Sequence, residues 1–241
     1  RNLPRSDFRE RSRVRELQAL KQVWEKEIEE EVRSLGSVPI HPARIAKEID
    51  RLKPENLVLA ADSAFNSFWF QGYPYFKIVK PGNSIAKSQF SFIGFAAAAA
   101  IGAKLATDDP VLAVCGDGGF HFVMPELATA VEYQIPVVFL VMDNNAIGWI
   151  KYWQQVVHQE RYLDTDFNPP IDFTTVAKAC SCRSLPLARP EDIAEVMREA
   201  FRITAEGEPV LVHARVDWSA RWWGSDDVVK VYTEGRVPRP V

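Results

Sequence analysis

Two polar residues that each follow an apolar run could together bind a divalent cation. Asp117 comes just after the run VLAVC, and Asn144 comes shortly after the run VVFLVM. The residues around Asp117 are glycines, namely Gly116, Gly118 and Gly119. Carboxylate and amide oxygens suit Mg²⁺, which usually takes further oxygens from a phosphate, and glycines let a phosphate approach main-chain N–H groups. The spacing predicts a metal ion that bridges the protein and a diphosphate.

The segment between these two polar residues predicts a βαβ unit. Asp-Gly alone is common in hairpin turns, but the residues after Gly119 follow helical rather than alternating spacing, which excludes a hairpin. A ten-residue helix spans ~15 Å and a strand of five or six residues spans ~17–20 Å, so the crossover nearly closes on itself. Asp117 and Asn144 should therefore emerge at the same carboxyl end of the sheet, where open α/β sheets bind ligands.

Short apolar runs and helical segments alternate along the chain from Pro39 onward. The expected strands are residues 57–61, 111–115, 137–142 and 210–216. The expected helices are residues 42–52, 90–106, 124–133, 172–180 and 190–204. Strands that alternate with helices predict an α/β fold with a doubly wound parallel sheet and helices on both faces.

The chain divides into three regions by its pattern. Residues 1–37 are dense in charge of both signs, with apolar residues at helical spacing, which predicts a charged helical connector. Residues 38–216 hold the alternating pattern of the main domain. Residues 217–241 show no clear periodicity, and we expect a tail that wraps as a loop or lid.

Composition excludes several classes of partner. The 241 residues carry a formal net charge of −3 with bases and acids interspersed, so we expect no nucleic acid. The spacing of Cys115, Cys180 and Cys182 fits neither a zinc knuckle nor a disulfide framework, which favours reduced thiols in a cytoplasmic protein. No apolar run reaches the ~18 residues that span a bilayer and no signal peptide is recognisable, so we expect no membrane.

The segment GDGGFHFVMPELATAVEYQIPVVFLVMDNNAIGWIKYWQ resembles the fingerprint of thiamine diphosphate enzymes, in which GDG is followed by NN. Here residues 119–143 lie between Gly118 and Asn144. More narrowly, the part from Glu126 to Gln154 resembles acetolactate synthase catalytic subunits and their relatives, the decarboxylases, carboligases and 2-hydroxyacyl-CoA lyases. The resemblance covers roughly residues 38–216. It is specific for the cofactor and much less so for the substrate.

The resemblance implies a set of ligands for thiamine diphosphate and Mg²⁺. Asp117 and Asn144 would be side-chain ligands of the metal, and Ala146 would add its main-chain carbonyl. The residues expected to bind the cofactor are Gly116, Gly118, Gly119, Ile93, Asn145 and Gly148. Ile93 would hold the cofactor bent between its two rings, although ordinary helix packing is the alternative. Further loops that touch the diphosphate are expected in residues 62–70 and 81–90.

Three residues are candidates for substrate contact. Trp149 and Trp153 lie four apart, so we expect them on one helix face. In the enzymes that the segment resembles, this helix borders the substrate pocket, but those enzymes usually have Met at position 149; packing in the core or an interface is the alternative for both tryptophans. His121 follows the glycines closely enough to contact cofactor or substrate, and a structural role is its alternative.

The resemblance implies a lyase or transferase that decarboxylates a 2-oxo acid or cleaves a 2-hydroxyacyl compound, with or without carboligation. In this family a catalytic glutamate comes from a separate pyrimidine-binding domain, and no such domain is recognisable here. We therefore expect half of an active site, completed by another chain or by a missing N-terminal part, in a homo- or hetero-oligomer. The alternatives are a β-type subunit of a two-chain 2-oxo acid decarboxylase and a non-catalytic subunit that binds thiamine diphosphate.

Overall fold

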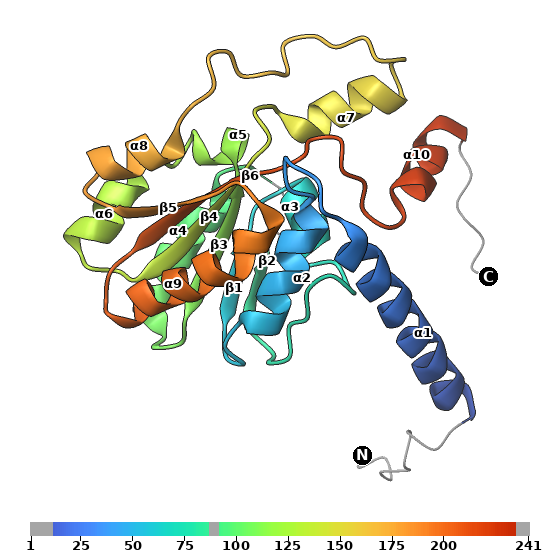
Figure 1. Cartoon of the computed structure of the whole chain (residues 1–241), viewed down its shortest axis with the longest axis horizontal. Coiled ribbons are helices and arrows are strands. Elements are labelled where there is room, and N and C mark those ends of the chain that lie inside the picture. Colours follow the sequence, from blue (N-terminus) through green and yellow to red (C-terminus); the bar gives the residue numbers. More distant parts are fainter. Residues whose placement is uncertain (1–11, 87–91, 235–241) are drawn as a thin grey trace, which may run out of the picture. The chain divides into compact units, whose positions relative to one another are not determined.

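The computed structural model describes residues 12–86 and 92–234 (Figure 1). It divides into two compact units, Arg1–Leu35 and Gly36–Val241. The first unit contains the helix α1 (Ser12–Ser34), and the part of the predicted connector before residue 12 lies outside the described residues. Ion pairs one turn apart support α1 on its surface, such as that between Arg13 and Glu16 at 2.9 Å.

The second unit is built on a parallel sheet of six strands in the order β2-β1-β3-β4-β6-β5. The strands are β1 (Val58–Ala61), β2 (Ser84–Ala86), β3 (Val111–Gly116), β4 (Val137–Asp143), β5 (Arg183–Leu187) and β6 (Val210–Arg215). The four predicted strands are confirmed as β1, β3, β4 and β6, and they form the centre of the sheet. A parallel sheet with helices on both faces confirms the predicted fold class.

Helices connect the strands and cover the sheet. They are α2 (Pro42–Leu52), α3 (Phe65–Phe70), α4 (Phe95–Ala106), α5 (Asp117–Phe120), α6 (Glu126–Glu132), α7 (Gly148–Val156), α8 (Phe173–Ala179), α9 (Ile193–Ala205) and α10 (Ser225–Glu234). A short 3₁₀ turn, Pro190–Asp192, precedes α9. The predicted helix at 42–52 matches α2, which begins with Pro42 and is capped by His41.

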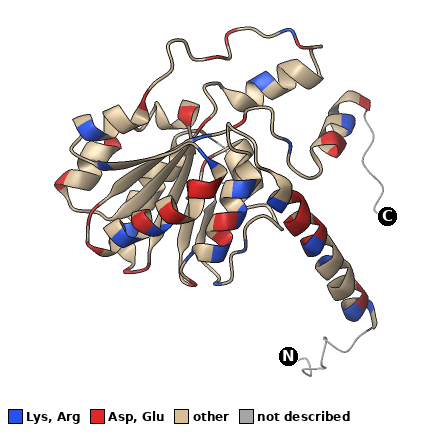
Figure 2. Cartoon of the chain, in the orientation of Figure 1, with Lys and Arg blue, Asp and Glu red and all other residues tan. Residues whose placement is uncertain are grey.

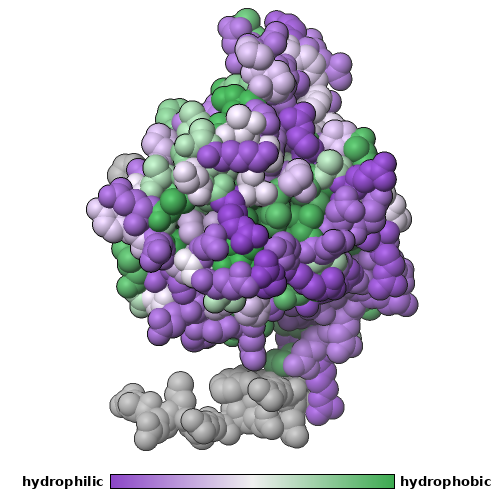
Figure 3. Space-filling model, turned by 60° about the vertical axis from the view of Figure 1, so that its left-hand side comes forward, coloured by the Kyte–Doolittle hydropathy of each residue, from purple (hydrophilic) through white to green (hydrophobic). Residues whose placement is uncertain are grey.

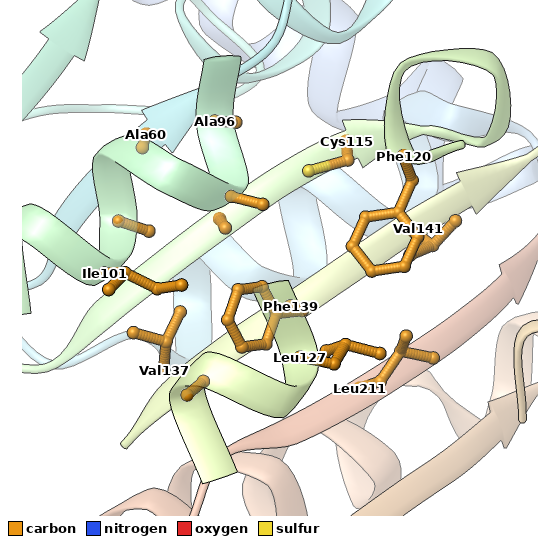
Figure 4. Packing of buried hydrophobic residues seen from close by; sticks show 14 of the residues in the cluster. Ala60, Ala96, Ile101, Cys115, Phe120, Leu127, Val137, Phe139, Val141 and Leu211 are labelled. Atoms are coloured by element: carbon orange, nitrogen blue, oxygen red, sulfur yellow. The ribbon is translucent and has the colours of Figure 1, made fainter. Parts of the chain in front are cut away.

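The core lies between the sheet and the helices on either face. On one face α4, α6 and α8 pack against side chains of the central strands, and Figure 4 shows Ile101 and Leu127 of these helices close to Phe139. On the other face α9 packs on β4, β5 and β6 and lies beside α2 (Figure 1). Because both faces are covered, β3 and β4 are buried almost throughout and carry continuous apolar runs.

The structure differs from the prediction at the edges of the sheet, at the start of one helix and in the C-terminal tail. The edge strands β2 and β5 were missed: β2 has three residues, and β5 is mostly exposed or half-buried, so neither carries an apolar run. The predicted helix at 90–106 begins later, at Phe95, and part of the predicted range lies outside the described residues. The tail after Asp217 contains the helix α10 rather than a loop alone.

The surface is largely polar. Most charged residues lie on the helices and connecting loops (Figure 2), and on the face shown in Figure 3 hydrophilic residues surround smaller hydrophobic patches. All three cysteines are free thiols. Within the described ranges we find no helix with the length and apolar character needed to span a bilayer.

Candidate functional site

A cavity of about 770 Å³ opens at the carboxyl ends of the central strands. This volume lies within the range of small-molecule sites, ~300–1,000 Å³. All the predicted site residues line the cavity except Asn145 and Trp153. Further residues of the lining come from the loop after β1, from α3 and from the segment after β6. The structure thus gathers the predicted residues around one cavity at the end of the sheet where α/β proteins bind ligands.

Asp117 and Asn144 meet at one point in this cavity. The backbone N–H of Ala146 donates to Asp117 Oδ2 and to Asn144 Oδ1, at 3.1 Å in each case. The register of the sheet explains this meeting. Gly116, the last residue of β3, pairs with Met142, and β4 ends one residue later at Asp143, so the two strands end at nearly the same level. The carboxylate oxygen and the amide oxygen therefore converge, as the βαβ geometry requires.

The main chain at Ala146 is turned toward the same point. Ala146 forms an isolated antiparallel bridge with Asp166, in which the N–H of Ile147 donates to Thr165 O at 2.7 Å and the N–H of Phe167 donates to Asn145 O at 3.1 Å. These two hydrogen bonds use the Ile147 N–H and the Asn145 carbonyl. The N–H and the carbonyl of Ala146 itself therefore point away from segment 165–167. Among the described residues, no donor is hydrogen-bonded to the Ala146 carbonyl. This carbonyl is thus available as a ligand.

Asp143, which was not predicted as a site residue, forms a buried network directly behind Asp117. Its Oδ2 lies 2.7 Å from His213 Nε2 and 2.6 Å from Arg215 Nη1, and its Oδ1 accepts from the N–H of Asn145 at 2.8 Å. Although burial acts in the opposite direction, these hydrogen bonds and the charge of Arg215 lower the pKa of Asp143. Asp143 is therefore an ionised carboxylate whose charge is matched.

The charge of Asp117 is not matched in this way. Asp117 is 3% exposed and accepts hydrogen bonds only from the backbone N–H groups of Gly118 and Ala146 among the described residues. Burial, and the negative charge of Asp143 beside it, raise the pKa of Asp117 to about 8. The described lining of the cavity includes no Lys or Arg side chain. A buried acid of this kind favours either a proton or a cation.

The donor set fits Mg²⁺. It offers a carboxylate, an amide oxygen and a main-chain carbonyl, all hard oxygen donors, and leaves other positions for phosphate oxygens or water. A divalent cation would also offset the unmatched charge of Asp117. No cluster of three or more His, Cys, Asp or Glu residues suited to a metal is present in the described part of the chain, so the proposed donor set depends on the Asn144 amide and the Ala146 carbonyl beside one carboxylate.

Two glycines are required by close approach. A Cβ on Gly119 would lie 2.3 Å from Asp62 Oδ2, and a Cβ on Gly148 would lie 2.5 Å from Asn144 Nδ2. Asp62 is buried and accepts hydrogen bonds from the N–H groups at the start of α4, including that of Phe95 at 2.8 Å. Gly119 thus lets the glycine turn pack against this cap, and Gly148 lets the Asn144 side chain fold back over the start of α7.

Ile93 lies outside the helix in which it was predicted. It precedes Gly94, which adopts a left-handed conformation with φ +81°, and α4 starts only at Phe95. The Ile93 side chain is 45% exposed and lines the cavity. Ordinary helix packing therefore does not account for this residue, and a large apolar group in the cavity would cover it.

An aromatic wall, formed by Phe65, Phe68 and Trp149, borders the cavity. Trp149 of α7 lies 5.5 Å from Phe65 and 5.6 Å from Phe68 of α3, measured between ring centroids. Behind the wall, Trp222 of the C-terminal segment stacks on Phe68 at 4.4 Å with 6° between the rings. Trp153 does not line the cavity and packs edge-on against Trp149 at 5.6 Å. The two tryptophans share a helix face, as predicted, and only Trp149 borders the cavity.

His121 also borders the cavity. Its ring lies 4.6 Å from that of Phe167 and 5.6 Å from that of Phe173, and its buried Nε2 has no hydrogen-bond partner among the described residues. Burial lowers the pKa of His121, against the opposing charge of Asp143. The ring is thus held neutral with one nitrogen unused.

Comparisons with known proteins agree with this geometry. The family model "Thiamine pyrophosphate enzyme, C-terminal TPP binding domain" matches residues 62–214. A probable acetolactate synthase large subunit of Methanococcus aeolicus is 32% identical over 78% of this chain and 32% of its own length. The acetolactate synthase isozyme 2 large subunit of Escherichia coli is 28% identical over 76% of this chain and 33% of its own length. The chain thus spans about one third of these relatives.

A solved structure shares the fold. The thiamine diphosphate-dependent 4-hydroxybenzoylformate decarboxylase of Rhodococcus jostii superposes with a TM-score of 0.67 over 78% of this chain and 34% of its own, at 23% sequence identity. The match of the family model includes the glycine turn after β3 and the loop after β4, which are the segments that meet at Ala146. This chain therefore belongs to the thiamine pyrophosphate enzymes and carries their C-terminal cofactor-binding domain.

Proposed function

We propose that this chain supplies the thiamine diphosphate- and Mg²⁺-binding half of the active site of a lyase or transferase. The enzyme would decarboxylate a 2-oxo acid or cleave a 2-hydroxyacyl compound, with or without carboligation. The observation that carries this proposal is the convergence of Asp117 Oδ2 and Asn144 Oδ1 on the N–H of Ala146. The names of the curated relatives, acetolactate synthases, favour 2-oxo acid chemistry.

In this proposal the residues of the chain bind and orient the cofactor. Asp117, Asn144 and the Ala146 carbonyl hold Mg²⁺, and the glycine turn presents its backbone to the diphosphate. The residues proposed to contact the cofactor around the metal are Gly116, Gly118, Gly119, Asn145, Gly148 and Ile93. When bound, thiamine diphosphate supplies the electron sink for cleavage of the bond next to the carbonyl.

The aromatic wall and His121 face the part of the cavity left for the substrate. Phe65, Phe68 and Trp149 would exclude water and pack against apolar groups of the substrate. His121, held neutral by burial, would offer its unused Nε2 as a hydrogen-bond acceptor or donor only after its ring turns, because this nitrogen is buried. Trp153 would support Trp149 from behind.

The rest of the active site would come from a pyrimidine-binding domain on another chain or on a further part of this protein. Support comes from the rim of the cavity, where Phe122 is 71% exposed and Ile150 is 46% exposed. Large apolar side chains at the mouth of a site suit a covering partner. Residues 1–37 would then connect to that part of the protein, residues 38–216 would bind the cofactor, and residues 217–241 would border the substrate side. The assembly would be a homo- or hetero-oligomer.

Calorimetry on the whole protein that contains this chain tests the cofactor assignment. Thiamine diphosphate should bind in the presence of Mg²⁺ and not in the presence of EDTA. A screen of pyruvate, larger 2-oxo acids and 2-hydroxyacyl-CoA thioesters then identifies the reaction. Cofactor binding without turnover of any of these compounds would instead support a non-catalytic subunit, and the absence of Mg²⁺-dependent binding would reject the proposal.

A further inference from the structure

Lys151 on α7 is a buried cation that no part of the proposed chemistry uses. It is 9% exposed and lies one turn beyond Ile147, whose carbonyl accepts from its backbone N–H at 3.0 Å. Its Nζ forms an ion pair with Asp166, and it lies 4.4 Å from the ring centroid of Trp218 and 5.6 Å from that of Tyr162. A charged side chain is rarely buried unless it is paired. The partners of Lys151 are these three side chains, and the question is what its burial between them achieves.

The contact with Asp166 reaches the metal-ligand loop. Asp166 is the residue that bridges Ala146, and the hydrogen bonds on either side of this bridge hold Asn145 and Ile147. The segment from Thr165 to Phe167 thus acts as a short strand against the loop that carries the proposed ligands. Lys151 joins this short strand to α7, which is the helix that the same loop enters.

The contact with Trp218 reaches the segment that follows β6. Trp218 lines the cavity, as do its neighbours Asp217 and Ala220. Four residues later Trp222 stacks behind the aromatic wall, and the N–H of Trp223 donates to the Tyr75 hydroxyl at 2.9 Å. An ammonium group is attracted to an aromatic face, and here Lys151 is buried while Trp218 is half-buried. The same Nζ therefore holds one edge of the C-terminal segment.

We propose that Lys151 is a positioning residue that clamps the metal-ligand loop and the C-terminal segment to α7, so that the two segments are ordered together. A single cation placed between a carboxylate and the faces of two aromatic rings joins three stretches of chain that are distant in sequence. Through the bridge between Ala146 and Asp166, the clamp would fix the direction of the Ala146 carbonyl. Through Trp218, it would close one side of the cavity.

Hydrogen exchange on the whole protein tests the clamp without any cofactor. Lys151→Met keeps the apolar stem and removes the charge, and Lys178→Met makes the same change at an exposed position of α8. Lys151→Met should speed exchange about tenfold at the amides of Ile147 and Phe167 and also at that of Trp223, because opening of a local segment becomes easier. Lys178→Met should leave all three amides unchanged. Equal exchange in the two variants, at either segment, would overturn the proposal.

Two further variants separate the halves of the clamp, and a third guards against misfolding of Lys151→Met. Asp166→Asn should speed exchange at Ile147 and Phe167 alone, and Trp218→Leu should speed it at Trp223 alone. Lys151→Arg keeps a cation that can pair with Asp166 and stack on the rings, so it should restore slow exchange at both segments. If Asp166→Asn and Trp218→Leu both leave exchange unchanged, the contacts do not order the segments and the proposal is wrong.

A second measurement rests on the proposed function. The Mg²⁺ affinity for loading with thiamine diphosphate should fall roughly tenfold in Lys151→Met, as for the loss of other residues that orient metal ligands, and should recover in Lys151→Arg. If the unmodified protein binds no cofactor with Mg²⁺, the proposed function fails while the exchange data still decide the clamp. If it binds and Lys151→Met binds equally well, only the inference about Lys151 fails.

Discussion

The carboxylates of Asp117 and Asp143 lie together at the ends of two neighbouring strands, yet only one of them has cationic or histidine partners. Asp143 is matched by Arg215 and His213, whereas Asp117 has only backbone N–H donors among the described residues. The raised pKa of Asp117, about 8, results from its burial and from this neighbour. An acidic side chain that is buried at the expense of folding stability and lies beside a cavity is typical of a functional site.

The variant Asp117→Asn should separate function from stability. It removes the proposed metal ligand charge and also the cost of either protonating the Asp117 carboxylate or burying its charge next to Asp143. Mg²⁺ affinity should therefore fall by more than the roughly 10–100-fold that the loss of an orienting residue costs. The free energy of unfolding without metal should stay the same or rise. Calorimetry and urea denaturation measure the two quantities, and a destabilised variant with unchanged Mg²⁺ affinity would contradict the assignment.

Asp143 should behave in the opposite way. Asp143→Ala removes the shared partner of Arg215 and His213, and among the described residues His213 keeps only Asp172, at 3.7 Å from its Nδ1, so the free energy of unfolding should fall by roughly 2–3 kcal/mol. This is below the ~3–5 kcal/mol of a fully buried pair, because the Arg215 side chain is 45% exposed. Asp143→Asn is the matched control, since it keeps an oxygen for the N–H of Asn145, and it should cost less. Equal losses in the two variants would show that the cost comes from the charge that both remove, and that the oxygen kept by Asn contributes nothing.

The centre of the sheet and the meeting of Asp117 with Asn144 could be predicted because both are encoded locally. The two strands carry continuous apolar runs, and each polar residue stands directly at or after the end of a strand. The prediction needed only the rule that neighbouring parallel strands end at the same edge of the sheet. Nothing distant in sequence was required.

The electrostatic partners could not be predicted, because they are distant in sequence. His213 and Asp143 are separated by 70 residues, and the Asp62 carboxylate that caps α4 is 33 residues from Phe95. The sequence around a single acidic residue does not indicate which distant residue will pair with it in the fold. The prediction missed the edge strands for a different reason. Strand β5 is only partly buried, so its sequence contains no apolar run that would identify it. The triplet DNN was the one signal that pointed to Asp143.

The contribution of His41 to stability should fall as the pH is lowered through the range in which histidine titrates, while Asp117, whose pKa is raised to about 8, contributes in the opposite direction. His41 Nδ1 accepts from the N–H of Ala43 at 3.2 Å and caps α2, and burial lowers the pKa of His41 against the opposing charge of Asp217. The unfolded chain therefore binds the proton first, at a pH near about 6.5. The contribution of His41 is present above that pH and is lost as the pH falls toward the lowered pKa of the folded state.

The variant His41→Asn tests this dependence. Asn keeps a side-chain acceptor at the cap and does not titrate, so the variant should lose less stability, or gain more, than the unmodified protein as the pH falls from about 7.5 to 5. His121, whose pKa is also lowered by burial, and Asp117, whose pKa is raised to about 8, titrate in both proteins and do not affect this difference. Urea denaturation at several pH values measures the difference, and parallel curves for the variant and the unmodified protein would exclude a role for His41.

Two glycines allow a matched test of the cradle beside the metal site. Gly119→Ala places a Cβ 2.3 Å from Asp62 Oδ2, so either the glycine turn or the cap of α4 must move. The free energy of unfolding should fall by about 1–3 kcal/mol, and cofactor binding should weaken because the glycine turn shifts. Gly102→Ala introduces the same methyl group inside α4, where nothing lies within 4 Å, and should raise stability by roughly 0.5–1 kcal/mol. Opposite signs for one chemical change would show that close packing against Asp62, rather than a general preference for glycine, governs position 119. A neutral Gly119→Ala that binds thiamine diphosphate normally would remove the glycine turn from the proposed site.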